Sequence, residues 1–201
     1  MIRRLAALLA LVPGPALAHH AMGGDTPTTL WQGLASGLAH PLIGADHLAF
    51  VLGLGLVSAL AGLGQLVPVA AMAAMAAGVL VHVAGLAVPG AEALIALSVV
   101  LVGLAILAPR GAWTGTPGRR IAALLTVLAV AAAVLHGYAH GESIVGAEPA
   151  PLAAYLAGLA GIQALLSLGV YALARRPLPL AVPRLAGAAI VLVGVAAGLA
   201  W

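Results

Sequence analysis

Charged side chains are scarce in this chain of 201 residues, where Asp, Glu, Lys and Arg together make up only 6%. Lysine and cysteine are absent, and aromatic residues amount to 3%. A soluble domain has about 25% charged residues, so a soluble enzyme, a nucleic-acid-binding domain and a disordered chain are excluded. The absence of cysteine excludes disulfides and thiolate ligands, which leaves His, Asp, Glu, Met and backbone oxygen as donors for any metal.

Hydrophobic residues make up 64% of the sequence and form long apolar stretches interrupted by glycine and proline. Stretches of roughly 20 residues suit transmembrane helices, whereas a membrane β-barrel would alternate polar and apolar residues. We therefore predict an all-α protein, a polytopic membrane helical bundle forming one domain over residues 19–201. Its partners are then the lipid bilayer and no nucleic acid, because the few arginines give no electrostatic footprint for one.

The first 18 residues have the organisation of a cleavable signal peptide. Two arginines form a charged n-region, a short apolar core follows, and residues 16–18 supply an A-x-A cleavage site. The alternative is a first transmembrane helix, but the run is too short and contains two prolines. Cleavage would leave a mature chain that begins His19-His20, outside a bacterial cytoplasmic membrane.

Six apolar segments follow, with glycine, proline and charge at the joints between them. They cover 29–63, 66–88, 91–108, 120–141, 150–173 and 183–201. We expect the first to break near His40-Pro41. Residues 29–39, too short to span alone, would form a half-helix or re-entrant piece, and the first complete span would cover about 42–62.

The arginines beyond the leader favour six spans by their placement. With the mature amino terminus outside, the cytoplasmic loops are 63–66, 109–119 and 174–183. These loops contain or border every arginine beyond the leader, while Asp25, Glu142 and Glu148 fall on the other side. An odd number of spans would break this positive-inside pattern. We therefore predict a multi-pass protein of the cytoplasmic membrane with both termini outside.

Several ionisable side chains lie inside or beside the apolar segments. Each costs on the order of 2.5–3.5 kcal/mol in hydrocarbon and therefore requires a partner, a water-filled cavity or a ligand. These residues are His40, Asp46, His47, His82, Glu92, His136 and His140, with Glu142 at the outer margin.

The first cluster spans residues 40–47. Pro41 suits the first turn of a helix, which predicts a helix beginning directly after His40. On that helix His40 and His47 lie two turns apart on one face, and Asp46 could ligate a metal or orient a histidine. Gly44 leaves room for close backbone approach. The structural alternative is a capped helix start with a buried His–Asp hydrogen bond.

The second cluster contains His136 and His140, which lie four residues apart and share one helix face. That spacing suits two ligands on one cation, with Glu142 following at the outer end. His82 is expected deep in the second span, as a ligand or equally as a core imidazole. Glu92 begins the third span, where it would favour a cation at the mouth or complement the positive end of its helix.

The predicted mature terminus combines a free amine, the imidazoles of His19 and His20, and the thioether of Met22. An amine and an imidazole on one residue can chelate a borderline metal such as nickel, cobalt or copper. The alternative is a flexible tail whose histidines bind nothing.

Three segments also carry a resemblance to one family. Residues 40–47, which read HPLIGADH, look like the H-P-x-x-G-x-D-H signature of the HupE/UreJ family of nickel and cobalt permeases. Residues 89–99 resemble that family's P-x-x-E-x-x-I-A-x-S-V segment, and residues 136–142 resemble its H-G-x-A-H-G-x-E segment. The segments occur in family order, and the resemblance runs from the leader to the last span.

The resemblance implies inward transport of Ni²⁺, with Co²⁺ as the alternative ion, for nickel enzymes such as hydrogenase or urease. The metal is then a transported ion and not a prosthetic group. The functional positions it implies are His40, Asp46, His47, His136, His140 and Glu142. The candidate contacts at the mouth or along the path are His19, His20, His82 and Glu92. A G-x-x-x-x-G-K-[ST] motif is absent from the sequence, so the transport would be secondary and independent of ATP.

Two other functions use the same residues. In an intramembrane hydrolase the histidines would hold Zn²⁺, and Asp46 or Glu142 would act as general base; the sequence contains no H-E-x-x-H and no nucleophile motif. A metal sensor or chaperone would require a sizeable cytoplasmic signalling domain, which the sequence does not show. The sequence leaves open the choice among Ni²⁺, Co²⁺ and Cu²⁺, the coupled ion, the order of sites and the oligomeric state.

Overall fold

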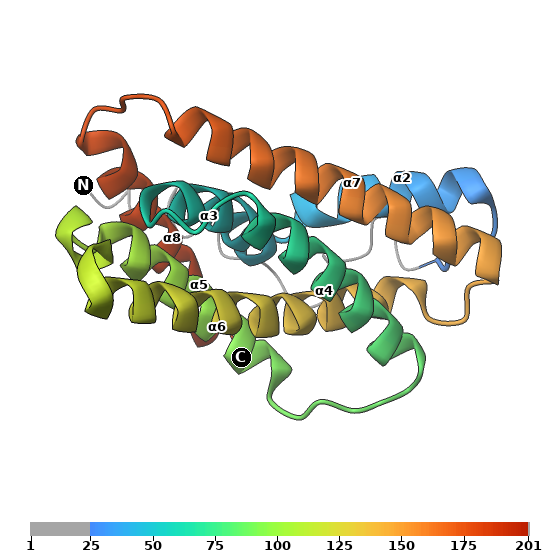
Figure 1. Ribbon diagram of the computed structural model, residues 1–201. Helices are drawn as coiled ribbons and strands as arrows, with labels where there is room; N and C mark the ends of the chain where they lie inside the picture. Colours follow the sequence, from blue (N-terminus) through green and yellow to red (C-terminus); the bar gives the residue numbers. More distant parts are fainter. Residues whose placement is uncertain (1–24, 201) are drawn as a thin grey trace, which may run out of the picture.

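The computed structural model describes residues 25–200, which are helical and contain no β-strand. The helices are α2 (Leu30–Ile43), α3 (Ala45–Leu60), α4 (Leu66–Val83), α5 (Ala91–Leu107), α6 (Gly115–Gly141), α7 (Pro149–Ala174) and α8 (Ala181–Leu199), with 3₁₀ turns η2 (Arg110–Trp113) and η3 (Glu142–Ile144). They pack lengthwise into a bundle (Figure 1). The predicted all-α helical bundle is confirmed. The signal peptide, His19, His20 and Met22 lie outside the described residues.

Four of the described helices, α4, α6, α7 and α8, are long and apolar enough to cross a membrane. Helices α2 and α3 pass the same test only together, with a bend of 83° between them. Helix α5 has 17 residues, a rise of about 26 Å against a hydrocarbon core of about 30 Å. The described chain therefore has four candidate spans, or five with the bent pair counted as one. The six-span arrangement stays a prediction.

The first apolar segment breaks at Gly44, close to the predicted His40-Pro41, but the prediction that a helix begins directly after His40 is wrong. Gly44 has an extended backbone (φ −83°, ψ 110°) that ends α2 and precedes α3. Pro41 therefore occupies the last turn of α2, where its missing N–H removes one helical hydrogen bond close to an end. His40 and His47 belong to different helices, so the prediction that they share a face of one helix is also wrong.

Helices α4 and α6 run parallel and touch backbone to backbone at glycines. A Cβ on Gly78 would overlap the carbonyl oxygen of Val134, and a Cβ on Gly137 would overlap that of Met75. Small residues that let helix backbones approach in this way are typical of membrane bundles, where packing replaces the hydrophobic driving force.

The same kind of contact joins α2 to α7 and α5 to α8 (Figure 1). Gly37 of α2 abuts the backbone of Tyr155 in α7, and Gly194 of α8 abuts the backbone of α5. These glycines therefore mark helix contacts. Gly161 of α7 is an exception, because no atom lies within 4 Å of the Cβ it would carry.

The charged residues of the described chain separate to the two ends of the bundle. The arginines lie where α5 and α7 end and where α6 and α8 begin: Arg110, Arg119, Arg120, Arg175, Arg176 and Arg184. The acids at the opposite end are Asp25, Glu92, Glu142 and Glu148. Among the described residues, Asp46 is the acid between these two ends. The three-dimensional arrangement thus keeps the charge asymmetry that the loops predict.

Replacing Gly137 by alanine is expected to destabilise the bundle, because the added methyl group would push α4 away from α6. Overpacking of this kind costs about 1–3 kcal/mol. Gly161→Ala is the matched control on an open face of α7, and it should be neutral or stabilising by up to about 1 kcal/mol, since alanine is the better helix former. Thermal melting in detergent micelles, followed by circular dichroism, measures both. Equal melting temperatures would contradict the packing.

Candidate functional site

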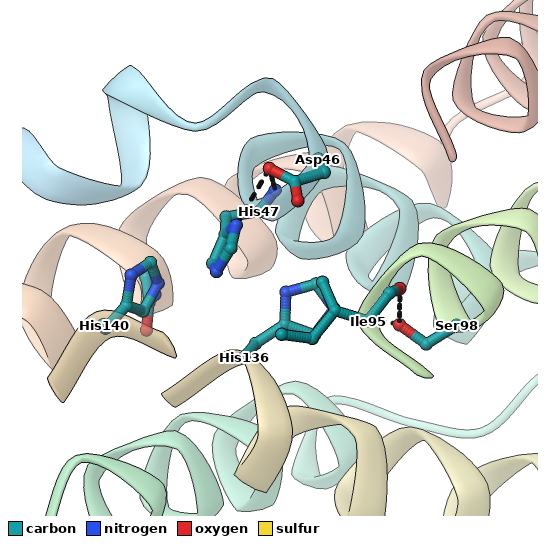
Figure 2. A network of polar contacts seen from close by, with 7 residues as sticks. Asp46, His47, Ile95, Ser98, His136 and His140 are labelled. Atoms are coloured by element: carbon teal, nitrogen blue, oxygen red, sulfur yellow. Dashed lines mark hydrogen bonds and ion pairs between the residues drawn. The ribbon is translucent and has the colours of Figure 1, made fainter. Parts of the chain in front are cut away.

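Among the described residues, four buried histidines from three helices meet inside the bundle. They are His40 of α2, His47 of α3, and His136 and His140 of α6, each at most 5% exposed. The ring of His47 lies between those of His140 and His136, with centroid separations of 4.3 and 4.8 Å. His40 contacts His140 at 4.6 Å. Figure 2 shows His47, His136 and His140 in this cluster. The two clusters seen in the sequence therefore form one site, which we call the histidine cluster.

Asp46 orients His47 at the start of α3 (Figure 2). Its Oδ1 accepts hydrogen bonds from the backbone N–H and from the ring Nδ1–H of His47, both at 2.9 Å. The first amides of a helix have no partner in the helix itself, and its positive end favours a carboxylate. Gly44 keeps the space open, because a Cβ there would lie 3.2 Å from His47 Nδ1. These contacts fit the orienting role, one of the two considered for Asp46.

Ser98 of α5 fixes the tautomer of His136. Its hydroxyl donates to the carbonyl oxygen of Ile95 at 2.7 Å and lies 2.9 Å from His136 Nε2. Since a hydroxyl has one proton, the Ser98 oxygen accepts from Nε2–H, and Nδ1 of His136 carries a lone pair. That Nδ1 is buried and has no hydrogen-bond partner in the described chain. A buried imidazole lone pair of this kind is what a metal ligand offers.

Two hydroxyls hold His40 in a similar way. Ser143 of η3 and Tyr155 of α7 lie 3.0 and 3.3 Å from His40 Nδ1. Both donate to the carbonyl oxygen of His140, at 3.1 and 2.9 Å. With their protons directed to that carbonyl, the hydroxyl oxygens accept from Nδ1–H of His40, which places the lone pair of this ring on Nε2.

Gln163 of α7 completes the set, with its Nε2 at 3.2 Å from Nε2 of His140. Each of the four rings therefore has one nitrogen beside a polar group of another side chain: a carboxylate, a hydroxyl or an amide. The carboxylate and hydroxyl oxygens beside His40, His47 and His136 are partners of the kind that set the tautomer and the lone-pair direction of metal-binding histidines. The Gln163 amide differs, because its N–H donates to Nε2 of His140.

The glycine that follows each histidine of α6 faces α4. Gly137 abuts the backbone of Met75, and Gly141 abuts the Cβ of His82. Neighbouring helix positions point about 100° apart, so α6 presents its imidazoles to the histidine cluster and its glycines to α4. In each His-Gly pair of α6, the histidine therefore belongs to the cluster and the glycine allows close packing against α4.

Ser143, Tyr155 and Gln163 are site residues that the sequence analysis misses, and it includes Ser98 only within a motif. Their signal in the sequence is a polar side chain inside an apolar segment, which is weaker than the signal of a charged group there. The position of Ser143 also shows that the third motif departs from the family pattern. The pattern H-G-x-A-H-G-x-E has one residue between the second glycine and the glutamate, whereas Glu142 follows Gly141 directly.

Two predicted site residues lie apart from the histidine cluster. Glu142 is exposed in η3. His82 lies in the last turn of α4, where its ring contacts that of Tyr138 at 4.5 Å, so the prediction that it lies deep in its span is wrong. The helix ends early because Gly85 takes a left-handed conformation (φ 75°). Glu92 lies in the first turn of α5, as predicted, and is partly buried.

Within residues 25–200, no three His, Asp or Glu side chains are placed so that they could hold one metal ion together. Neighbouring rings in the cluster pack at interplanar angles of 79°, 82° and 46° instead. The structure brings the predicted histidines together as neighbours, and their joint coordination of an ion stays a prediction.

A multi-pass helical membrane protein with a buried histidine cluster is the class that this fold and site define. The sequence matches the HupE / UreJ protein family over residues 6–197. It is 30% identical to Protein HupE of Rhizobium leguminosarum bv. viciae over 198 residues, which cover 96% of each chain. The chain belongs to the HupE/UreJ family, and the resemblance seen in its motifs is confirmed. No solved structure matches it.

Replacing Ser98 by alanine should release the tautomer of His136, because Nε2–H loses its acceptor in a buried position, at a cost of about 1–3 kcal/mol. ¹⁵N-histidine NMR of the protein in micelles distinguishes a protonated from an unprotonated ring nitrogen. We expect Nδ1 of His136 to be unprotonated in the wild type and to gain proton occupancy in Ser98→Ala. Thr126→Val removes a hydroxyl bonded within α6 and should leave the spectrum unchanged. An unshifted His136 signal in Ser98→Ala would disprove the assignment.

Proposed function

We propose that this protein is a secondary carrier that brings Ni²⁺, with Co²⁺ as the alternative ion, into a bacterial cell. The observation that carries the proposal is the cluster of four buried histidines, each with one nitrogen placed beside a polar side chain. Membership of the HupE/UreJ family supports it, since the motif resemblance links these residues to nickel supply for enzymes such as hydrogenase or urease.

The donor chemistry fits a borderline divalent cation. Imidazole nitrogen suits Ni²⁺, Co²⁺ and Zn²⁺, and the chain has no thiolate that would hold such an ion more tightly. A transport site must bind strongly enough to take up the ion and weakly enough to release it. In our proposal His40, His47, His136 and His140 are the ligands, and Asp46 supports His47 and contributes negative charge.

The charge distribution supports an inward direction. In our proposal the arginine end of the bundle faces the cytoplasm, in agreement with the positive-inside rule, and the acidic end faces outward. Glu92 and Glu142 then favour cations at the mouth, together with His19 and His20 of the mature terminus. If the short helix α5 also crosses the membrane, the number of spans is six, and both termini then lie outside.

The membrane potential supplies a driving force in this arrangement. It contributes about 2.3 kcal/mol per elementary charge per 100 mV, and hence about twice that for a divalent cation. Nothing in the described residues favours the intramembrane zinc hydrolase, because Asp46 is bonded to His47 and Glu142 is exposed. Neither carboxylate is therefore placed to act as a general base on a water molecule at the cluster.

Uptake of ⁶³Ni²⁺ by cells that lack their own nickel transporters tests the proposal. The wild type should accumulate the ion, and His40→Ala and His140→Ala should fall to the level of cells without the protein, because each removes a ligand. Asp46→Asn should weaken apparent affinity about 10- to 100-fold, the usual effect of changing the partner of a metal-binding histidine.

Glu148→Gln is the matched control for charge, since its side chain is exposed at the same end of the bundle and has no role in the proposed route, and it should retain most of the uptake. All variants are compared at equal membrane abundance, and competition by unlabelled Co²⁺ measures selectivity. A well-expressed wild type that moves no more ion than empty membranes would overturn the carrier. Full uptake by His40→Ala and His140→Ala would exclude the cluster from the route.

A further inference from the structure

Three polar atoms on α7 and α3 are buried without a hydrogen-bond partner in the described chain: Oε1 of Gln163, Oγ of Ser167 and Oγ of Ser58. All three side chains are 0% exposed. Buried polar groups in proteins are nearly always bonded. Three exceptions on two packed helices therefore indicate that another species satisfies them.

The two serines are unusual even for helical residues. A hydroxyl inside a helix normally donates to a carbonyl three or four residues earlier. Thr126 does so to Ala122 at 3.0 Å, and Ser98 does so to Ile95 at 2.7 Å. Ser58 and Ser167 make no such bond, so their hydroxyl protons and lone pairs are both available to a ligand.

These residues line up with the histidine cluster. Gln163 approaches His140 at 3.2 Å, and Ser167 lies one turn further along the same face of α7. The backbone carbonyl of Ser167 abuts Gly55 of α3, and Ser58 lies one turn beyond Gly55. Gln163, Ser167 and Ser58 thus form a polar stripe that leads from the cluster along the α3–α7 contact toward the arginine end.

The cavity that borders the cluster on the side of His136 is apolar. It has a volume of about 50 Å³ and lies between α3, α5 and α6, and Ser98 is the single polar side chain in its lining. The ring of Phe50 lines it and stacks on His136 at 4.0 Å. An ion leaving that way would lose its water and gain no donor in exchange, which is strongly unfavourable.

We propose that the polar stripe is the inner half of the ion's route, a hydrated path for a divalent cation between the histidine cluster and the cytoplasm. This inference rests on the proposed function. The amide and hydroxyl groups exchange hydrogen bonds with the water molecules bound to the ion. Such contacts are weaker than imidazole coordination, so the ion moves on from the cluster without being trapped again.

The absence of cysteine from the sequence allows a direct test of hydration. Ser58→Cys and Ser167→Cys are made in the full chain, in membrane vesicles, and treated with a small cationic methanethiosulfonate. Both thiols should be modified, as measured by the mass of the protein, and Ni²⁺ should slow the reaction. Ala71→Cys, equally 0% exposed but in the apolar core, is the matched control and should stay unmodified.

Two results would overturn the proposal. If both serine positions are as unreactive as Ala71→Cys, the stripe is dry. If both react but Ni²⁺ does not slow them, the stripe holds water and lies off the ion's route. Labelling does not require transport, so it can fail or succeed independently of the carrier assay.

Transport rates give a second measurement. Ser58→Ala and Ser167→Ala each remove one oxygen and fill no space, so the bundle stays folded. Each should lower the maximal rate of ⁶³Ni²⁺ uptake about fivefold, the effect of losing one ordinary hydrogen bond, with little change in KM. Thr126→Val, whose hydroxyl is bonded within its own helix, should keep the wild-type rate. If the variant with both Ser58→Ala and Ser167→Ala transports at the maximal rate of the wild type, the stripe is not part of the route. If the wild-type protein itself shows no uptake, the carrier proposal fails instead.

Discussion

An imidazole ring inside an apolar bundle must have its N–H group bonded, and the site is built around this requirement. Water is scarce there, so the partners come from other side chains. Asp46, Ser98 and the Ser143–Tyr155 pair accept from His47, His136 and His40. Because the partners lie on different helices, satisfying the rings also ties α2, α5, α6 and α7 together around the start of α3.

Glycine makes these bonds reachable. A hydroxyl or an amide can bond an imidazole on another helix only if the two backbones are close. Gly37 brings α2 against Tyr155 of α7, one turn before His40, and Gly137 brings α6 against α4 beside His136. Gly37 is therefore part of the site's chemistry, because a Cβ there would move His40 away from Tyr155, whereas Gly137 sets the α4–α6 packing behind His136.

Composition and periodicity predict the helical class, and the incompatibility of histidine with hydrocarbon predicts the site residues. The sequence does not show how the first apolar segment bends. Thr29 and Gln32 form a capping box that starts α2 at Leu30, and Pro41 lies in the last turn of that helix, where the preference of proline for a helix start misleads. Nor does it show that Ser143 bonds His40, because the two are 103 residues apart and only packing brings them together.

Fixing the N–H of a ring has a consequence for the proposed ion transfer. A histidine whose N–H is bonded directs its other lone pair, so in the proposed carrier His40, His47 and His136 are oriented before a cation arrives and lose little conformational entropy on binding. The same organisation would hold the ion too long if the next donors were also imidazoles. Weak oxygen donors, as in Gln163 and Ser167, allow release because water competes with them on equal terms. Strong nitrogen donors followed by weak oxygen donors is the order that a carrier of a borderline metal requires.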